Sequence, residues 1–204
     1  VNIMLLENTP TLLTPRLILR RFAPEDLPAV FDIYSDREAN RFLPWFPAET
    51  MADARRFLEE RYLAVYERPS GYAYAVCRRE DNIPIGYLHV DTDEPHDFGY
   101  GFRKAFWGQG YAAEAGAAVI ARLKADGMPY ITATHDVLNP RSGRVMEKLS
   151  MRYCYTYREQ WQPKDIPVDF RMYQLNLDGE EGRVYRGYWE KYPHFIEDLG
   201  GKAR

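Results

Sequence analysis

Short runs in which apolar and polar residues alternate recur along the chain, and each run predicts a β-strand. Aromatic and β-branched side chains, which favour strands, are frequent in these runs. The polar residues 79–82 between two of them predict a hairpin. We expect seven strands, at positions 17–20, 72–78, 85–90, 97–102, 130–135, 153–157 and 168–175.

Apolar residues repeated at every third or fourth position predict helices at 24–35 and 50–67, the second opened by a capping-box pattern at Thr50. An alanine-rich stretch before Asp126 predicts a third helix, and Asn139 followed by a proline is typical of the start of a fourth. This order of elements predicts a mixed α/β fold, in which about four helices flank a largely antiparallel seven-stranded sheet.

The length of 204 residues fits one domain, and no repeat or linker divides the sequence. We expect a domain over residues 1–177 and a C-terminal extension over 178–204. Four aromatic residues of the extension recur at helical spacing: Tyr185, Trp189, Tyr192 and Phe195. They predict a helix packed on the domain or on a second subunit, although Pro193 falls within the pattern.

Composition excludes several classes of protein. Hydrophobic residues make up 46% of the chain and charged residues 28%, as in soluble globular proteins. A net charge of −3 is far from the basic balance of a nucleic-acid binder, and no apolar run is long enough to span a membrane. Cys77 and Cys154 are far apart and lack metal-ligand spacing. We expect a cytoplasmic monomer or homodimer that binds no metal, nucleic acid or membrane.

The stretch 102–114 carries the most specific chemistry of the chain. A strand ends there, a loop with Gly108 and Gly110 follows, and a helix begins. The first N–H groups of a helix have no partner within it, and the helix macrodipole adds partial positive charge. Glycine lets the backbone approach a ligand closely, and Arg103 and Lys104 precede the turn. This arrangement predicts a site for a phosphate or pyrophosphate.

Two classes of phosphate-binding protein fit this loop. Gly108, Gly110 and Ala113 satisfy the dinucleotide fingerprint G-x-G-x-x-A, which would indicate a nicotinamide-dependent oxidoreductase. That fingerprint belongs directly after a buried hydrophobic strand, whereas residues 103–107 are polar and irregular. No acidic residue ends a second strand at the expected distance either. The dinucleotide interpretation is therefore the weaker one.

The stretch Trp107-Gly-Gln-Gly-Tyr-Ala112 resembles the acyl-CoA loop of the GNAT superfamily of N-acetyltransferases. With Trp107 in place of the usual Arg or Gln, it is most similar to the RimJ/RimL-like branch, which acetylates ribosomal proteins. Residues 139–149 and 14–20 resemble the same branch, so that the resemblance spans residues 12–177. It implies the GNAT fold and direct transfer from acetyl-CoA to a primary amine in a ternary complex. A non-catalytic acyl-CoA-binding module on the same fold is the alternative.

The resemblance also implies how the cofactor is bound. Backbone N–H groups of residues 109–113 would hold the pyrophosphate, and the strand end at residues 102–104 would pair its backbone with the pantetheine arm. Arg103 and Lys104 would add charge unless they are merely solvated. Asn139 would bond a pantetheine amide, or would only cap its helix. The implied cofactor-binding residues are Phe102, Arg103, Lys104, Gln109, Gly110, Tyr111, Ala112, Ala113, Asn139 and Ser142.

For catalysis, the resemblance implies Ser142, one helical turn after Asn139 and near the thioester. Many members of the superfamily place a tyrosine acid seven residues after the asparagine, but Met146 stands there in this chain. Two candidates remain for the group that accepts the amine proton. Asp97 matches a position where relatives carry Glu, and His135 titrates near neutrality as an ordinary histidine. Each also fits a structural role.

The acceptor amine is left open by the sequence. Phe42 and Trp45 lie in a segment that lines the acceptor side in relatives, or they fill the core. Deprotonating an amine at pH 7 costs about 4.6 kcal/mol for a lysine side chain and about 1.4 kcal/mol for an α-amine. An α-amine therefore asks less of the enzyme, which agrees with a ribosomal-protein or peptide N-terminus, although a small amine also fits.

Overall fold

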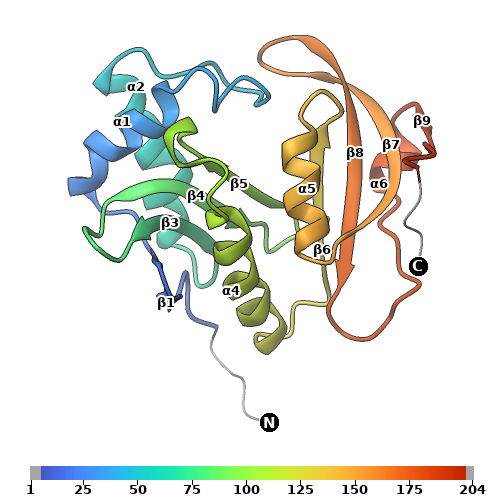
Figure 1. The fold of residues 1–204 in the computed structure, drawn as a ribbon, viewed down its shortest axis with the longest axis horizontal. Coiled ribbons are helices and arrows are strands. Elements are labelled where there is room, and N and C mark those ends of the chain that lie inside the picture. Colours follow the sequence, from blue (N-terminus) through green and yellow to red (C-terminus); the bar gives the residue numbers. More distant parts are fainter. Residues whose placement is uncertain (1–5, 201–204) are drawn as a thin grey trace.

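The computed structural model describes residues 6–200, so that the outer ends of the expected domain and extension lie outside it (Figure 1). Its strands are β1 Leu12–Leu13, β2 Leu17–Arg20, β3 Tyr72–Arg78, β4 Pro84–Val90, β5 Phe98–Phe102, β6 Tyr130–Asp136, β7 Arg152–Trp161, β8 Ile166–Asn176 and β9 His194–Phe195. Its helices are α1 Leu27–Ser35, α2 Met51–Leu58, α3 Ala64–Tyr66, α4 Tyr111–Ala125, α5 Pro140–Lys148 and α6 Gly187–Lys191. Short 3-10 turns, η1 Pro24–Asp26 and η3 Lys104–Phe106, precede α1 and follow β5, and a π-helical turn, η2 Glu59–Leu63, joins α2 to α3.

The strands form two antiparallel sheets that meet at one point. One has the order β1-β2-β3-β4-β5 and the other β6-β8-β7-β9. A parallel bridge between Asp97 and Thr132 links the start of β5 to β6, and no other ladder joins these two strands in the part of the chain described (Figure 1). The mixed α/β class is confirmed, whereas the single seven-stranded sheet is wrong. The two strands that were not predicted, β1 and β9, have two residues each, too few for alternation to show.

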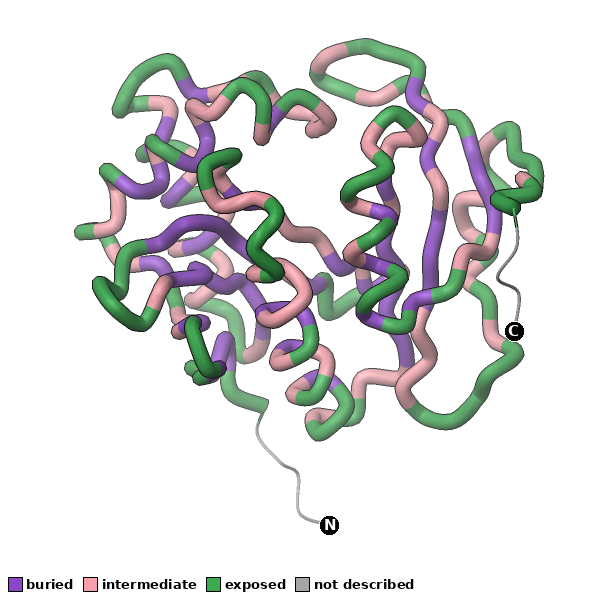
Figure 2. Tube along the Cα trace, viewed as in Figure 1, coloured by how far each residue is buried: buried purple, intermediate pink, exposed green. Residues whose placement is uncertain are grey.

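Helices cover both faces of the first sheet. On one face, Leu88 of β4 packs in a core with Val119 of α4. On the other face, Tyr87 packs in a second core with Val30 of α1 and Leu58 of α2. Figure 2 shows buried positions following the strands and exposed positions on the outer sides of the helices. Successive residues of β4 thus belong to opposite cores, as the alternation of a strand requires.

Helix α2 begins with the capping box that the sequence predicts. Thr50 Oγ1 accepts a hydrogen bond from the Asp53 N–H at 3.1 Å, and Asp53 Oδ2 accepts one from the Thr50 N–H at 3.0 Å. The chain stays helical through α2, the π-helical turn and α3 to Tyr66, which confirms the helix expected at 50–67. π-Helical turns are rare and occur frequently at functional sites. This one carries Arg61.

The C-terminal extension differs from the helix predicted for it. Helix α6 has five residues and ends at Lys191. Pro193 follows, and a proline cannot continue a helix because it lacks the backbone N–H. Phe195 lies in β9, which pairs with β7, so the prediction of a helix reaching Phe195 is wrong.

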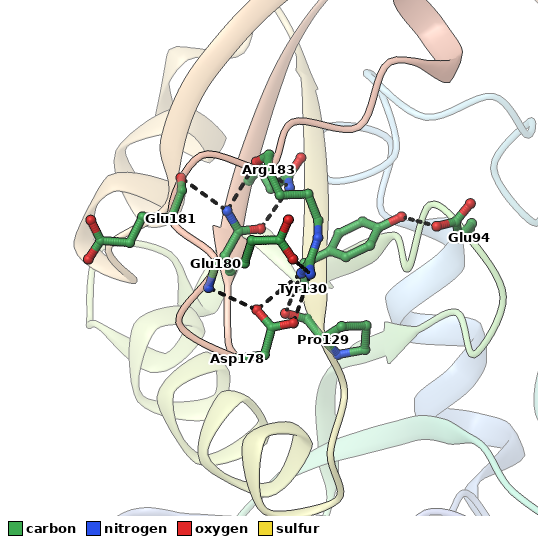
Figure 3. A network of polar contacts seen from close by, with 9 residues as sticks. Glu94, Pro129, Tyr130, Asp178, Glu180, Glu181 and Arg183 are labelled. Carbon is green, nitrogen blue, oxygen red and sulfur yellow. Dashed lines mark hydrogen bonds and ion pairs between the residues drawn. The ribbon is translucent and has the colours of Figure 1, made fainter.

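Two polar networks fasten the extension to the domain. Arg183 donates a hydrogen bond to the Pro129 carbonyl at 3.2 Å, just before β6 (Figure 3). Farther along, the Glu197 carboxylate accepts two hydrogen bonds from Arg171 of β8, at 2.8 and 3.0 Å, and one from Thr156 of β7 at 2.6 Å. The extension therefore packs on the second sheet of its own chain.

Candidate functional site

Helix α4 begins at a glycine turn that leaves backbone donors free. Gly110 is its N-cap residue and has a φ of +80°, in the left-handed region that glycine adopts without strain. The N–H groups of residues 111–113 have no intrahelical acceptor, as at the start of every helix, and no side chain caps them here. Glu114 fixes the helix start, since its carboxylate accepts hydrogen bonds from Thr14 at 2.6 Å and from Arg16 at 2.8 Å.

A cavity of about 490 Å³ lies at this helix start and is called the cofactor cavity below. Arg141 of α5 stacks over the Trp107 ring, 4.0 Å from its centroid, and so joins the helix to the loop. None of the described residues that line the cavity is acidic. Its cations give it a positive potential suited to phosphates. They are Lys104, Arg141, Arg144 and Lys148.

Four of the ten predicted cofactor residues do not line this cavity: Asn139 and Ser142 line a neighbouring cavity, and Arg103 and Gln109 line neither. Arg103 points toward Asp32 of α1, with 3.9 Å between the guanidinium and the carboxylate. The side chain of Gln109 donates a hydrogen bond to the Ala105 carbonyl at 3.4 Å. Lys104, in contrast, is part of the lining. The position of Arg103 gives no support to a phosphate contact, whereas that of Lys104 does.

Strand β5 is the edge strand of the first sheet and borders the opening between β5 and β6. The backbone groups of its odd-numbered residues hydrogen-bond to β4; the Arg103 N–H, for example, donates to the Ile85 carbonyl at 3.1 Å. The backbone groups of Tyr100 and Phe102 therefore point the other way, toward the opening. The N–H of Lys104 donates to the Asp36 carboxylate at 2.8 Å. Of the predicted pairing segment 102–104, only Phe102 therefore has its N–H free for a ligand, and Tyr100 extends this free edge.

A second cavity, of about 360 Å³, continues from the first along α5 and shares Phe102 and Trp107 with it. Inside it, the Tyr100 hydroxyl donates a hydrogen bond to the Ser142 carbonyl at 2.8 Å and lies 3.0 Å from Ser142 Oγ. Burial raises the pKa of Tyr100, so its phenol stays protonated. Tyr100 therefore holds the serine that is predicted to act near the thioester.

Asn139 occupies the N-cap position of α5, as predicted, but its side chain makes no capping hydrogen bond. At the start of α2, in contrast, the side chain of the N-cap residue Thr50 accepts a hydrogen bond from the Asp53 N–H. Asn139 lines the second cavity and also the third, which lies beyond it. Its amide is thus available to a ligand, and a helix-cap role does not account for it.

The third cavity, of about 290 Å³, lies where β5 and β6 part, and is called the acceptor cavity below. It shares Tyr100, Asn139 and Ser142 with the second cavity. Aromatic side chains from distant segments supply many of its walls, among them Tyr87, Phe98, Trp161 and Phe170. The residues predicted for catalysis and acceptor binding all line it: Phe42, Trp45, Asp97, His135 and Ser142.

His89 of β4 is a candidate residue that the sequence analysis missed. Its Nε2 lies 3.6 Å from the Asp97 carboxylate, and both residues line the acceptor cavity. Its ring lies against Gly99 of β5, where an added Cβ would come within 2.4 Å of His89 Cε1. A glycine inside a strand signals such a close approach, but it does not say which side chain approaches.

His135 borders the cavity with its free nitrogen sealed off. Nδ1 lies 2.8 Å from the Asp136 carbonyl, so Nδ1 donates and Nε2 carries the lone pair. Nε2 is buried, has no partner in residues 6–200, and faces Gly143, where an added Cβ would lie 2.6 Å away. Burial lowers the pKa of His135 and keeps the ring neutral. This geometry favours the structural role of His135 over the catalytic one.

The part of the chain that is described contains no group of three His, Cys, Asp or Glu side chains placed to hold a metal ion. Within residues 6–200, no helix combines the length and the apolar character needed to cross a membrane.

Comparisons with known proteins agree with this geometry. The family model of the acetyltransferase (GNAT) domain matches residues 16–152. The chain is 25% identical over 171 residues to the uncharacterized N-acetyltransferase YoaA of Bacillus subtilis, covering 81% of this chain and 96% of YoaA. It is 28% identical over 158 residues to YnaD of the same organism, covering 76% and 86%.

Solved structures share the fold. A GNAT-family acetyltransferase from Bacillus anthracis superposes with a TM-score of 0.72 at 24% identity, covering 83% of this chain and 99% of the other. RimL, a ribosomal-protein alpha-N-acetyltransferase in complex with coenzyme A, has the same TM-score of 0.72 at 18% identity, covering 84% and 100%.

Proposed function

The chain belongs to the GNAT acetyltransferase family, and we propose on that premise that it transfers the acetyl group of acetyl-CoA directly to a primary amine in a ternary complex. The observation that carries this proposal is the continuity of three cavities, which share walls from the start of α4 to the opening between β5 and β6. An extended acyl donor and an amine can meet along this path without a covalent enzyme intermediate.

The cofactor cavity binds the anionic end of the donor in this proposal. The free N–H groups of residues 111–113 bind the pyrophosphate, where the macrodipole of α4 favours negative charge. Lys104 and Arg144 line the same cavity and add positive charge. The free edge of β5 at Tyr100 pairs with the pantetheine arm as an added strand would, and the Asn139 amide binds beside it.

The acceptor amine must lose a proton to attack the thioester. We assign that proton to the imidazole of His89, because its ring lines the acceptor cavity and Asp97, 3.6 Å from Nε2, stabilises the imidazolium that forms. In this step the amine nitrogen bonds to the acetyl carbon, the carbon–sulfur bond breaks, and the proton passes to His89. Asp97 then acts through His89 as a positioning residue.

The departing thiolate needs a hydrogen-bond donor. Met146 occupies the place of the tyrosine used by many relatives, and it is buried. Ser142 takes over this role in the proposal, since it lines both the second cavity and the acceptor cavity. Tyr100 positions Ser142 through the hydrogen bond that its hydroxyl donates to the Ser142 carbonyl at 2.8 Å, which leaves the Ser142 hydroxyl proton for the thiolate.

The acceptor in this proposal includes α-amines. RimL, by its name, acetylates the alpha-amine of a ribosomal protein. Deprotonating an α-amine at pH 7 takes about 3 kcal/mol less free energy than deprotonating a lysine side chain. A small amine fits the same chemistry. We place the reaction in the cytoplasm, where a thiol such as Cys77 stays reduced.

Calorimetric titration with acetyl-CoA tests the cofactor assignment. We expect micromolar binding by the wild type and a loss of at least about 30-fold in Gly110→Glu, because the new carboxylate repels phosphate and strains a residue with a φ of +80°. Gly127→Glu is the matched control: it follows the other end of α4, has a φ of +85°, and nothing lies within 4 Å of its added Cβ.

Equal affinity of wild type and Gly110→Glu would contradict the loop assignment, as would an equal loss in Gly127→Glu. If the protein bound NAD and did not bind acetyl-CoA, the dinucleotide interpretation would be favoured instead. Binding of acetyl-CoA with no transfer to any amine of a broad panel would mark the protein as an acyl-CoA-binding module.

A further inference from the structure

Arg61 is a cation at the acceptor cavity that the proposed transfer does not use. It lies in the π-helical turn between α2 and α3 and lines both the acceptor cavity and a fourth cavity of about 210 Å³. Tyr87 and His89 of β4 line the same two cavities. These three residues therefore form a wall that the two cavities share.

The Arg61 guanidinium has no anionic partner among residues 6–200. It stacks over the Trp45 ring, 3.9 Å from the centroid. No carboxylate in residues 6–200 forms an ion pair with it. Arg16 and Arg171, in contrast, each hold a carboxylate at 2.8 Å. A half-buried guanidinium in a cavity wall with no ion pair among residues 6–200 is free to bind an anionic ligand.

Three tyrosines surround this cation. Tyr34 stacks on Tyr87, with ring centroids 5.4 Å apart and 7° between the planes, and shares a short hydrogen bond with the Tyr62 hydroxyl. The Tyr87 hydroxyl is buried and has no hydrogen-bond partner in the described chain. Burial raises the pKa of all three phenols, although the nearby Arg61 charge opposes the rise, so they stay neutral donors. The side chains around Arg61 are thus neutral phenols, which leave its charge without a counter-ion among residues 6–200.

We infer that the amine acceptor also carries a carboxylate, which Arg61 binds while the amine lies at His89 and Asp97. The acceptor would then be a small amino acid in its free form, and not a peptide N-terminus, whose α-amine is followed by an amide. This inference rests on the proposed acetyl transfer. Arginine presents parallel donors that match a carboxylate, which makes the pair both strong and specific.

The spacing within the wall supports a compact acceptor. Tyr87 and His89 are two residues apart on one strand and point to the same face. Their rings are nearly parallel, with centroids 6.4 Å apart. Tyr87, which shares a wall with Arg61, therefore lies beside the proposed amine site, as the two ends of one small molecule would require. A volume of about 290 Å³ is at the lower end for ligand cavities, which favours the same conclusion.

Matched pairs of acceptors test this inference: free amino acids with apolar, aromatic and acidic side chains, each beside its own α-carboxamide. The full-length enzyme with saturating acetyl-CoA is expected to show a kcat/KM at least about tenfold higher for the acid than for the amide of the preferred side chain. In Arg61→Gln, the KM for the acid rises about 10- to 100-fold while the amide is unaffected, so the preference disappears.

Arg61→Lys keeps the charge and should retain part of the preference, which separates electrostatics from damage to the fold. Arg55→Gln, on the exposed side of α2, is the control and should behave as the wild type. Equal rates on acids and amides, a preference that survives in Arg61→Gln, or no transfer to any free amino acid would each overturn the inference. Failure of the wild type to bind acetyl-CoA in the same calorimeter would instead overturn the proposed acetyl transfer.

Discussion

The cofactor cavity and the acceptor cavity are built in different ways. Consecutive residues, 102–113, form most of the cofactor cavity together with one side of α5. Its binding groups are backbone N–H groups and exposed cations. The acceptor cavity draws its walls from the segments on either side of α2 and from β4, β5, β6 and β8. Its binding groups are nearly all side chains.

This difference explains why one cavity implies a ligand class and the other does not. Backbone donors at the start of a helix bind phosphate when the turn has the right conformation and no negative side chain stands beside it. Side-chain walls instead set the size, charge and hydrogen bonding of the ligand they accept. The acceptor cavity is therefore where we expect substitutions to change specificity without any change in cofactor affinity.

Substitution of His89 gives the sharpest separation of the two cavities. We expect His89→Asn to lower kcat about 100-fold, a loss of about 2.7 kcal/mol of transition-state stabilisation, because a general base contributes 10²- to 10⁴-fold. Calorimetry should show an unchanged Kd for acetyl-CoA. His194→Asn, in exposed β9, should leave kcat as it is. A normal kcat in His89→Asn would assign proton acceptance to Asp97 through water.

The same difference accounts for what the sequence predicted and what it missed. Local patterns placed nearly every strand and helix near the site, along with the turn at Gly110, because each depends on neighbours in the chain. Phe42 and Trp45 were matched to the acceptor side only through a resemblance. His89 and Arg61 could not be picked out from the sequence, because the roles proposed for them depend on tertiary neighbours: Asp97 for His89, and for Arg61 the lack of a carboxylate partner among residues 6–200.

The C-terminal extension tests how far the acceptor side depends on long-range contacts. Glu197→Gln removes the charge from a carboxylate that Arg171 and Thr156 bind, and we expect a loss of about 2 kcal/mol in the free energy of unfolding at pH 7. Hydrogen bonding to Arg171 lowers the pKa of Glu197. Its contribution is therefore complete above the unfolded pKa, near 4.3, and disappears as the pH falls through the folded value.

Chemical denaturation of wild type and Glu197→Gln at pH 7 and in acid measures this contribution. Glu190→Gln, an exposed substitution in α6, should cost less than about 0.5 kcal/mol. A Glu197→Gln penalty that persisted below pH 3 would show that packing, and not the charge, holds the extension in place.

Asn139 and Thr50 form a matched pair of N-cap residues, of which only Asn139 lines the cavities of the site. Asn139→Ala should weaken acetyl-CoA binding about tenfold, or 1.4 kcal/mol, with little change in stability, because its side chain caps nothing. Thr50→Ala should instead cost about 1 kcal/mol of stability and leave the affinity unchanged, because it removes a capping box. If both variants lost only stability, Asn139 would be a helix cap and not a cofactor ligand.

The smallest expected effect distinguishes a structural histidine from a catalytic one within the acceptor cavity. Burial lowers the pKa of His135 in the fold, so the unfolded chain binds its proton more readily. Its contribution to stability is therefore complete above the unfolded pKa, near 6.5, and is lost as the pH falls through the lower folded value. His135→Asn, whose amide can replace the Nδ1–H donor, should show a weaker loss of stability between pH 7.5 and pH 5.5 in denaturation experiments. Its pH profile of kcat should match the wild type, because Nε2 is sealed against Gly143; a shifted profile would return His135 to the catalytic step.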